Sequence, residues 1–125
     1  YTASSGTRNV ATIIGLGLAI DFITSIGLEK IQQRTLQIRN YCLAELKKIK
    51  GLKVISPESR SLSTGIVSFS LDSVSNADVF NKLNDQDIIV KLLSQHNAIR
   101  ISCHLFVSKQ DIDQFIKALK QLVKI

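Results

Sequence analysis

Apolar residues at helical spacing dominate the first fifty residues. Asn9 can cap a helix over about residues 10–26, and Gly27 is placed to end that helix in the left-handed conformation. The first half of this helix is apolar on nearly every side, which is typical of a helix buried against a neighbour. A second helix is predicted over about residues 28–50 and ends at Gly51. Its apolar stripe consists of Leu28, Ile31, Thr35, Ile38, Cys42, Leu46 and Ile49.

From residue 52 onward, shorter apolar runs and alternating patterns predict four strands. They cover residues 52–56, 65–71, 88–93 and 98–103, with Pro57 ending the first and a four-residue polar loop, 94–97, joining the last two. The second strand alternates and is therefore half buried. On one face it carries Ile66, Ser68 and Ser70, and on the other Val67, Phe69 and Leu71.

Two further helices follow from capping signals. Ser75 can cap a short helix that continues to about Leu83, and Ser108 with Asp111 resembles a capping box at the start of a terminal helix. Their inward positions are Ala77, Val79, Phe80, Leu83, Ile112, Phe115, Ile116, Leu119 and Leu122. The order of elements predicts an α+β fold, in which helices cover one small, mainly antiparallel, four-stranded sheet.

Composition is that of one globular domain, because 45% of the 125 residues are hydrophobic and 21% are charged. The net charge of +6 is spread along the chain without interleaved aromatic residues, so no nucleic-acid partner is expected. The apolar run 10–20 is too short to span a bilayer, and no membrane partner is expected. Two cysteines without CxxC spacing favour a cytoplasmic location. The absence of methionine indicates a piece of a longer protein.

Arg100 is the most informative residue, because it places a permanent charge between Ile99 and Ile101 on an apolar strand. Its side chain points to the face opposite theirs, and a guanidinium there needs an anionic partner such as a carboxylate held by two hydrogen bonds. That partner is a substrate, an internal Asp or Glu, or, at a sheet edge, solvent.

The other chemical candidates are weaker. Residues 4–9, Ser-Ser-Gly-Thr-Arg-Asn, combine small residues with a helix N-terminus and form either an anion site or a simple capping loop. His96, His104 and Cys103 lack metal-ligand spacing, so no metal site is predicted. Cys103 and His104 point to opposite strand faces and form no catalytic pair, and Cys42 is interpreted as a core residue.

Three motifs together resemble a known family. GTRN before the apolar helix, the strand GIVSF, and AIRIS followed by CHLFVSKQDID are similar to the C-terminal region of class V aminotransferases. These fold-type I pyridoxal phosphate enzymes include cysteine desulfurases and isopenicillin-epimerase-like proteins. The resemblance covers essentially all 125 residues and implies the C-terminal small domain, with residues 1–27 leading from the large domain and residues 28–125 forming the small one.

The resemblance also implies roles for three residues. Arg100 would bind the α-carboxylate of an amino-acid substrate, and Gly6 and Thr7 would bind the phosphate of the cofactor in the partner subunit of a homodimer. The lysine that binds pyridoxal phosphate would lie upstream, so the chain alone should be inactive and holds no catalytic residue. Once separated from its large domain, the chain should self-associate through its first helix.

One departure from the family bears on the reaction. Cysteine desulfurases carry a persulfide-forming cysteine in the loop before the arginine strand, where this chain has only Ser-Gln-His-Asn at 94–97. A lyase, epimerase or transaminase reaction is therefore favoured over desulfuration. The alternative is a free-standing α+β regulatory or protein-interaction module in which Arg100 forms a structural ion pair.

Overall fold

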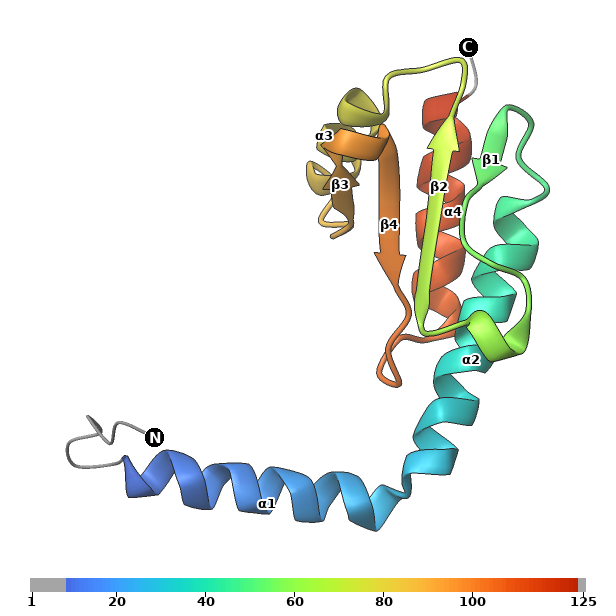
Figure 1. Cartoon of the computed structure of the whole chain (residues 1–125). Coiled ribbons are helices and arrows are strands. Elements are labelled where there is room, and N and C mark those ends of the chain that lie inside the picture. Colours follow the sequence, from blue (N-terminus) through green and yellow to red (C-terminus); the bar gives the residue numbers. More distant parts are fainter. Residues whose placement is uncertain (1–8, 124–125) are drawn as a thin grey trace. The chain divides into compact units, whose positions relative to one another are not determined.

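Figure 1 shows the fold in a computed structural model that describes residues 9–123. The chain divides into two compact units, Tyr1–Ile31 and Gln32–Ile125. The first contains helix α1 (Val10–Ile26) and the beginning of α2 (Leu28–Leu46), and the second contains the sheet. Gly6 and Thr7 lie outside the described residues. The division between residues 27 and 28 inferred from the family resemblance stays a prediction.

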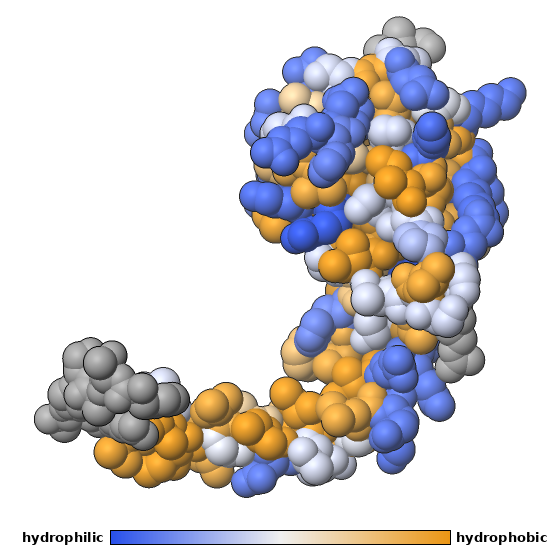
Figure 2. Space-filling view, viewed as in Figure 1, coloured by the Kyte–Doolittle hydropathy of each residue, from blue (hydrophilic) through white to orange (hydrophobic). Residues whose placement is uncertain are grey.

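Helix α1 forms where the sequence predicts it. The amide of Thr12 donates to Asn9 Oδ1 at 3.1 Å, and Gly27 ends the helix with φ of 93°. No residue of α1 is buried within this chain, and its surface is largely hydrophobic (Figure 2). Its large apolar side chains from Val10 to Ile23 are 42–65% exposed.

No single helix in residues 9–123 is long and apolar enough to cross a membrane. Taken together across their break, α1 and α2 do meet the length and composition expected of a broken span.

Helix α2 is shorter than predicted. It ends at Leu46, because the amides of Lys48 and Ile49 donate to carbonyls three residues back and Gly51 adopts φ of 75°. The first position of the predicted apolar stripe, Leu28, is 64% exposed, so its expected burial is wrong. The buried residues of α2 are Leu36, Ile38, Arg39, Cys42, Leu43 and Leu46.

The four strands form one antiparallel sheet in the order β1-β2-β4-β3. They are β1 (Leu52–Val54), β2 (Ile66–Leu71), β3 (Lys91–Leu93) and β4 (Ala98–Ser102). Each is shorter than predicted. The largest difference is in β3, because Asp87 adopts φ of 58° and the amide of Ile88 donates to the Leu83 carbonyl, which keeps residues 88–90 out of the ladder.

The core lies between one face of the sheet and the helices. Figure 1 shows α4 (Lys109–Val123) running behind β2, and the rings of Phe69 and Phe115 lie 6.4 Å apart between them. The capping box is confirmed, since the amide of Ser108 donates to Asp111 Oδ2 at 2.8 Å. In α3 (Asn76–Asn84) the inward position expected for Ala77 is wrong, because Ala77 is exposed.

Candidate functional site

Arg100 lies in the middle of the sheet, with β2 on one side and β3 on the other. Ser68 is its cross-strand partner on β2, and Lys91 is its partner on β3. Its neighbours Ile99 and Ile101 are buried on the helix side, so these three polar side chains share the opposite face. We call this row of Ser68, Arg100 and Lys91 the arginine row.

The arginine row has an unbalanced positive charge. Arg100 is half-buried, and its Nε is buried without a hydrogen-bond acceptor in residues 9–123. Within residues 9–123 two ion pairs form, Lys47–Glu58 and Lys48–Glu45, and neither includes a residue of the arginine row. Opposed cross-strand residues have Cβ atoms about 5 Å apart, and like charges at that distance repel. The row therefore favours an anion from outside the described chain.

A short and tightly held turn precedes the arginine strand. Residues 94–96 form one turn of 3-10 helix, and Asn97 adopts the left-handed conformation with φ of 43°. The side-chain amide of buried Asn76 donates to the Asn97 carbonyl at 3.1 Å, while its Oδ1 accepts from the amide of Leu71 at 3.1 Å. These bonds of the Asn76 side chain connect the turn to the end of β2. The start of β4 is therefore held by the turn before it, as well as by its pairing with β2 and β3.

The cysteines lie away from the arginine row. Cys42 and Cys103 are both buried in the core on the helix side of the sheet, whereas Arg100 points to the other side. His96 and His104 are exposed, and His104 stacks near Phe106 with ring centroids 5.0 Å apart. Among the residues that the structure describes, no cluster of three potential metal ligands occurs.

Comparisons with known proteins show which family the chain belongs to. The family model for aminotransferase class-V matches residues 1–115, which is nearly the whole chain. The chain belongs to the aminotransferase class-V family. Its relatives include the cysteine desulfurase of Wigglesworthia glossinidia brevipalpis, 30% identical over 96% of this chain and 31% of that protein. The probable cysteine desulfurase of Halalkalibacterium halodurans is 33% identical over 93% of this chain and 30% of that protein.

The fold of this class-V chain agrees with a solved structure. The apo cysteine desulfurase from Thermococcus onnurineus NA1 superposes with a TM-score of 0.84 at 25% identity, covering 97% of this chain and 33% of that one. This confirms both the family resemblance and the α+β fold expected from the sequence. The chain spans about a third of the length of the curated relatives that it matches.

The start of α1 in this class-V chain has the donors that an anion needs. The side chain and carbonyl of Asn9 accept from the amides of Thr12 and Ile13, and the amides of Val10 and Ala11 find no acceptor within residues 9–123. Unpaired amides at a helix N-terminus fit a phosphate group. Gly6 and Thr7, the phosphate ligands expected from the sequence, directly precede this helix start along the chain.

Proposed function

We propose that this chain is the C-terminal part of a pyridoxal-phosphate enzyme that acts on an amino acid, and that Arg100 binds the substrate's α-carboxylate. The family assignment supports the enzyme class, and one observation supports the residue. A half-buried guanidinium on an inner strand, beside a second cation and without a carboxylate partner in residues 9–123, favours an external anion. A carboxylate offers two oxygens to the guanidinium fork, which suits this position.

Arg100 would act by holding the substrate in one orientation. Its strand is fixed by β2, by β3 and by the Asn76 contacts to the preceding turn, so the point on the sheet from which the guanidinium extends is fixed. A carboxylate held at two points fixes the rotation of the amino acid about its α-carbon, which selects the bond that is aligned to break. Lys91 adds positive charge beside the carboxylate and strengthens its binding.

Pyridoxal phosphate, when bound, supplies an electron sink for the bond broken at the α-carbon of the amino acid. We assign Gly6 and Thr7 to its phosphate, contributed to the partner subunit of a homodimer. The amides of Val10 and Ala11, which find no acceptor within residues 9–123, support an anion there. In this assignment residues 1–27 lead from the large domain and residues 28–125 form the small domain. The lysine that holds the cofactor lies outside this chain, so the chain alone is inactive.

The reaction uses no cysteine from this chain. The turn at 94–97 contains no cysteine, and its Asn97 carbonyl accepts a hydrogen bond from the side chain of Asn76. Both thiols of the chain face the helices, on the side of the sheet away from Arg100. A substrate bound at the arginine row is therefore out of reach of Cys42 and Cys103. Lyase, epimerase or transaminase chemistry fits this arrangement better than sulfur transfer through a mobile cysteine.

The test uses the complete enzyme that contains this chain, purified with its cofactor. A panel of amino acids is titrated while the absorbance of the bound cofactor is recorded, which gives a dissociation constant without relying on turnover. Two charge-assisted hydrogen bonds are lost in Arg100→Ala, and the affinity should fall by about 100-fold or more. Lys53→Ala is the matched control, because Lys53 is an exposed cation on the same face of β1, paired with Ser70.

The control should keep its affinity within about threefold, since an exposed charge two strands away is screened by solvent. Equal losses in Arg100→Ala and Lys53→Ala would show that only general positive charge matters and would refute the role of Arg100. A complete enzyme without any absorbance from bound cofactor would refute the assignment to pyridoxal-phosphate chemistry.

A further inference from the structure

On the face opposite the helices, the polar side chains of the four strands are all cations or hydroxyls. No strand contains an aspartate or a glutamate. The arginine row crosses the middle of this face, and a third cation stands on the edge strand β1. The face therefore favours a ligand with negative charge, and the spacing of the cations decides where a ligand places each acid group. Its polar residues are Lys53, Ser68, Ser70, Lys91, Arg100 and Ser102.

Lys91 is the cation nearest to Arg100 on this face. The two residues are cross-strand partners on adjacent strands, and Cβ atoms opposed in this way lie about 5 Å apart. On the other side of Arg100 the partner is Ser68, which carries no charge. Lys53 lies two strands away, at a distance of about 10 Å or more. A second acid group on a ligand of Arg100 is therefore drawn toward β3 and not toward β1.

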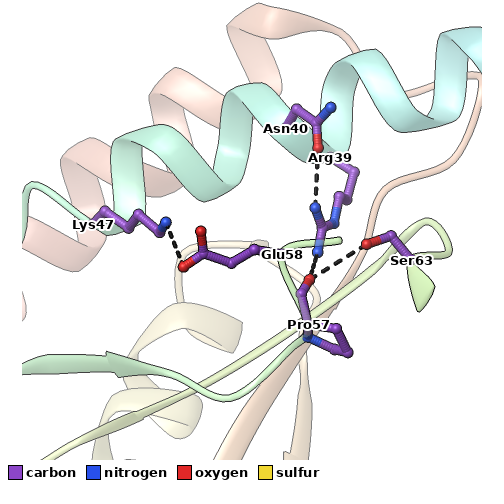
Figure 3. Close-up of polar contacts among 6 residues, drawn as sticks. All are labelled: Arg39, Asn40, Lys47, Pro57, Glu58 and Ser63. Carbon is purple, nitrogen blue, oxygen red and sulfur yellow. Dashed lines mark hydrogen bonds and ion pairs between the residues drawn. The ribbon is translucent and has the colours of Figure 1, made fainter. Parts of the chain in front are cut away.

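Arg39 shows how the chain satisfies a buried guanidinium elsewhere (Figure 3). Its Nε also lacks an acceptor, but its other nitrogen atoms donate to Asn40 Oδ1 at 3.0 Å and to the carbonyl of Pro57. Within residues 9–123, by contrast, the side chains of Arg100 and Lys91 have no hydrogen bond or ion pair. Both members of this cationic pair are thus available to a ligand.

The two cations differ in depth. Arg100 is half-buried on an inner strand, whereas Lys91 is exposed on the edge strand. The acid group at Arg100 would be the more deeply held, and the second group would lie near solvent, within reach of the flexible lysine side chain. The two carboxyl carbons of an amino acid with an acidic side chain are joined through three or four bonds and lie about 4–5 Å apart when extended. This spacing matches that of the two strand positions.

We propose that the arginine row takes an amino acid whose side chain carries a second carboxylate, which Lys91 binds while Arg100 binds the α-carboxylate. This inference rests on the proposed function and adds the substrate class to it. Two opposed like charges repel each other, and a ligand with two carboxylates balances both of them. An amino acid with a neutral side chain leaves one cation unbalanced and should bind less tightly.

The test compares ligands that have nearly the same shape but differ in side-chain charge: aspartate with asparagine, and glutamate with glutamine. Each is titrated into the complete enzyme with its cofactor, and the absorbance of the cofactor gives the dissociation constant. In at least one pair the acid should bind about fivefold more tightly than the amide, a modest ratio because Lys91 is exposed. Added salt should reduce this ratio.

Variants of Lys91 assign the preference to one residue. Lys91→Gln should bring the ratio to about one, and Lys91→Glu should make the amide the tighter ligand, because a carboxylate then faces a carboxylate. The matched control is Lys53→Gln, which should leave the ratio unchanged, since Lys53 is two strands away. Ratios also cancel any equal change in the binding of the α-carboxylate that both ligands of a pair share.

Three results would overturn the proposal. They are a ratio of about one or less in both pairs for the wild-type enzyme, a ratio unchanged by Lys91→Gln, and no absorbance response to either acid where another amino acid responds. Each of these leaves the role of Arg100 standing as long as Arg100→Ala still loses affinity for the amino acid that responds. If Arg100→Ala keeps that affinity, the proposed function itself has failed.

Discussion

Gly65→Ala is the sharpest test of the packing behind the arginine strand. A methyl group at this position would overlap the carbonyl oxygen of Cys103 and lie 2.6 Å from Thr35 Cγ2. The two backbones are held together here, since the amide of Cys103 donates to the Gly65 carbonyl at 2.6 Å. The methyl group therefore has to separate β4 from the start of β2, or move α2 away from both.

The loss in free energy of unfolding depends on which groups the new methyl group displaces. Overpacking a core position costs about 1–3 kcal/mol, and the upper part of that range applies because the nearer obstacle is a backbone carbonyl that no rotamer change removes. Weakening the hydrogen bond from Cys103 adds about 1 kcal/mol. A total of about 3 kcal/mol is a large part of the stability of a domain of this size. It lowers the midpoint of thermal unfolding by about 10–20 °C.

Urea unfolding followed by circular dichroism measures this change. Gly17→Ala is the matched control. Apart from the backbone of its own helix, no described residue comes within 4 Å of the added methyl, and alanine is the better helix former, so it should not destabilise the chain. Thr35→Ser removes the methyl obstacle and should recover only a minor part of the loss when combined with Gly65→Ala. A loss below about 0.5 kcal/mol in Gly65→Ala, or full recovery in the double variant, would refute this reasoning.

Three further predictions concern other parts of the chain. Asn76→Ala should lower the free energy of unfolding in urea by about 3 kcal/mol, because it removes the buried hydrogen bonds of the Asn76 side chain to the backbone of Leu71 and Asn97. A loss below about 1 kcal/mol would contradict this. The hydrogen bond of Tyr41 to Asp113 raises the pKa of the phenol to about 12, so its stabilising contribution is full below pH 10 and is lost between pH 10 and 12. Tyr41→Phe should flatten that decline, and superimposable pH profiles would count against it. The exposed apolar side chains of α1 should make the chain self-associate, as measured by sedimentation velocity, and the double variant Ile13→Lys with Leu18→Lys should self-associate less. A wild-type chain that stays monomeric at high concentration would contradict this prediction.

Local signals predicted most of the fold. Asn9, Ser75 and Ser108 cap helices where the sequence places them, because a side-chain oxygen needs only the amides of the next few residues. The alternation in residues 65–71 was equally reliable, since burial of one sheet face imposes it. Strand lengths were overestimated because pairing depends on the partner: residues 88–90 have a strand-like sequence but are turned toward α3 by Asp87.

The candidate site was only partly visible in the sequence. Arg100 stood out because a charge interrupts an apolar strand. Lys91 gave no such signal, since its position opposite Arg100 depends on the register of β3. Asn76 and Arg39 gave no signal in the sequence either, because their burial arises from contacts with distant segments. Pattern within one element cannot show such contacts.

Carboxylate binding by Arg100 is tested most directly by comparing each ligand with its decarboxylated amine. In the complete enzyme, the amino acid with the largest absorbance response should bind about 100-fold more tightly than the corresponding amine. Arg100→Gln should bring the two affinities close together by weakening the amino acid alone, whereas Lys53→Gln should leave their ratio unchanged. A ratio that stays at the wild-type value in Arg100→Gln would contradict the assignment of Arg100 to the substrate carboxylate.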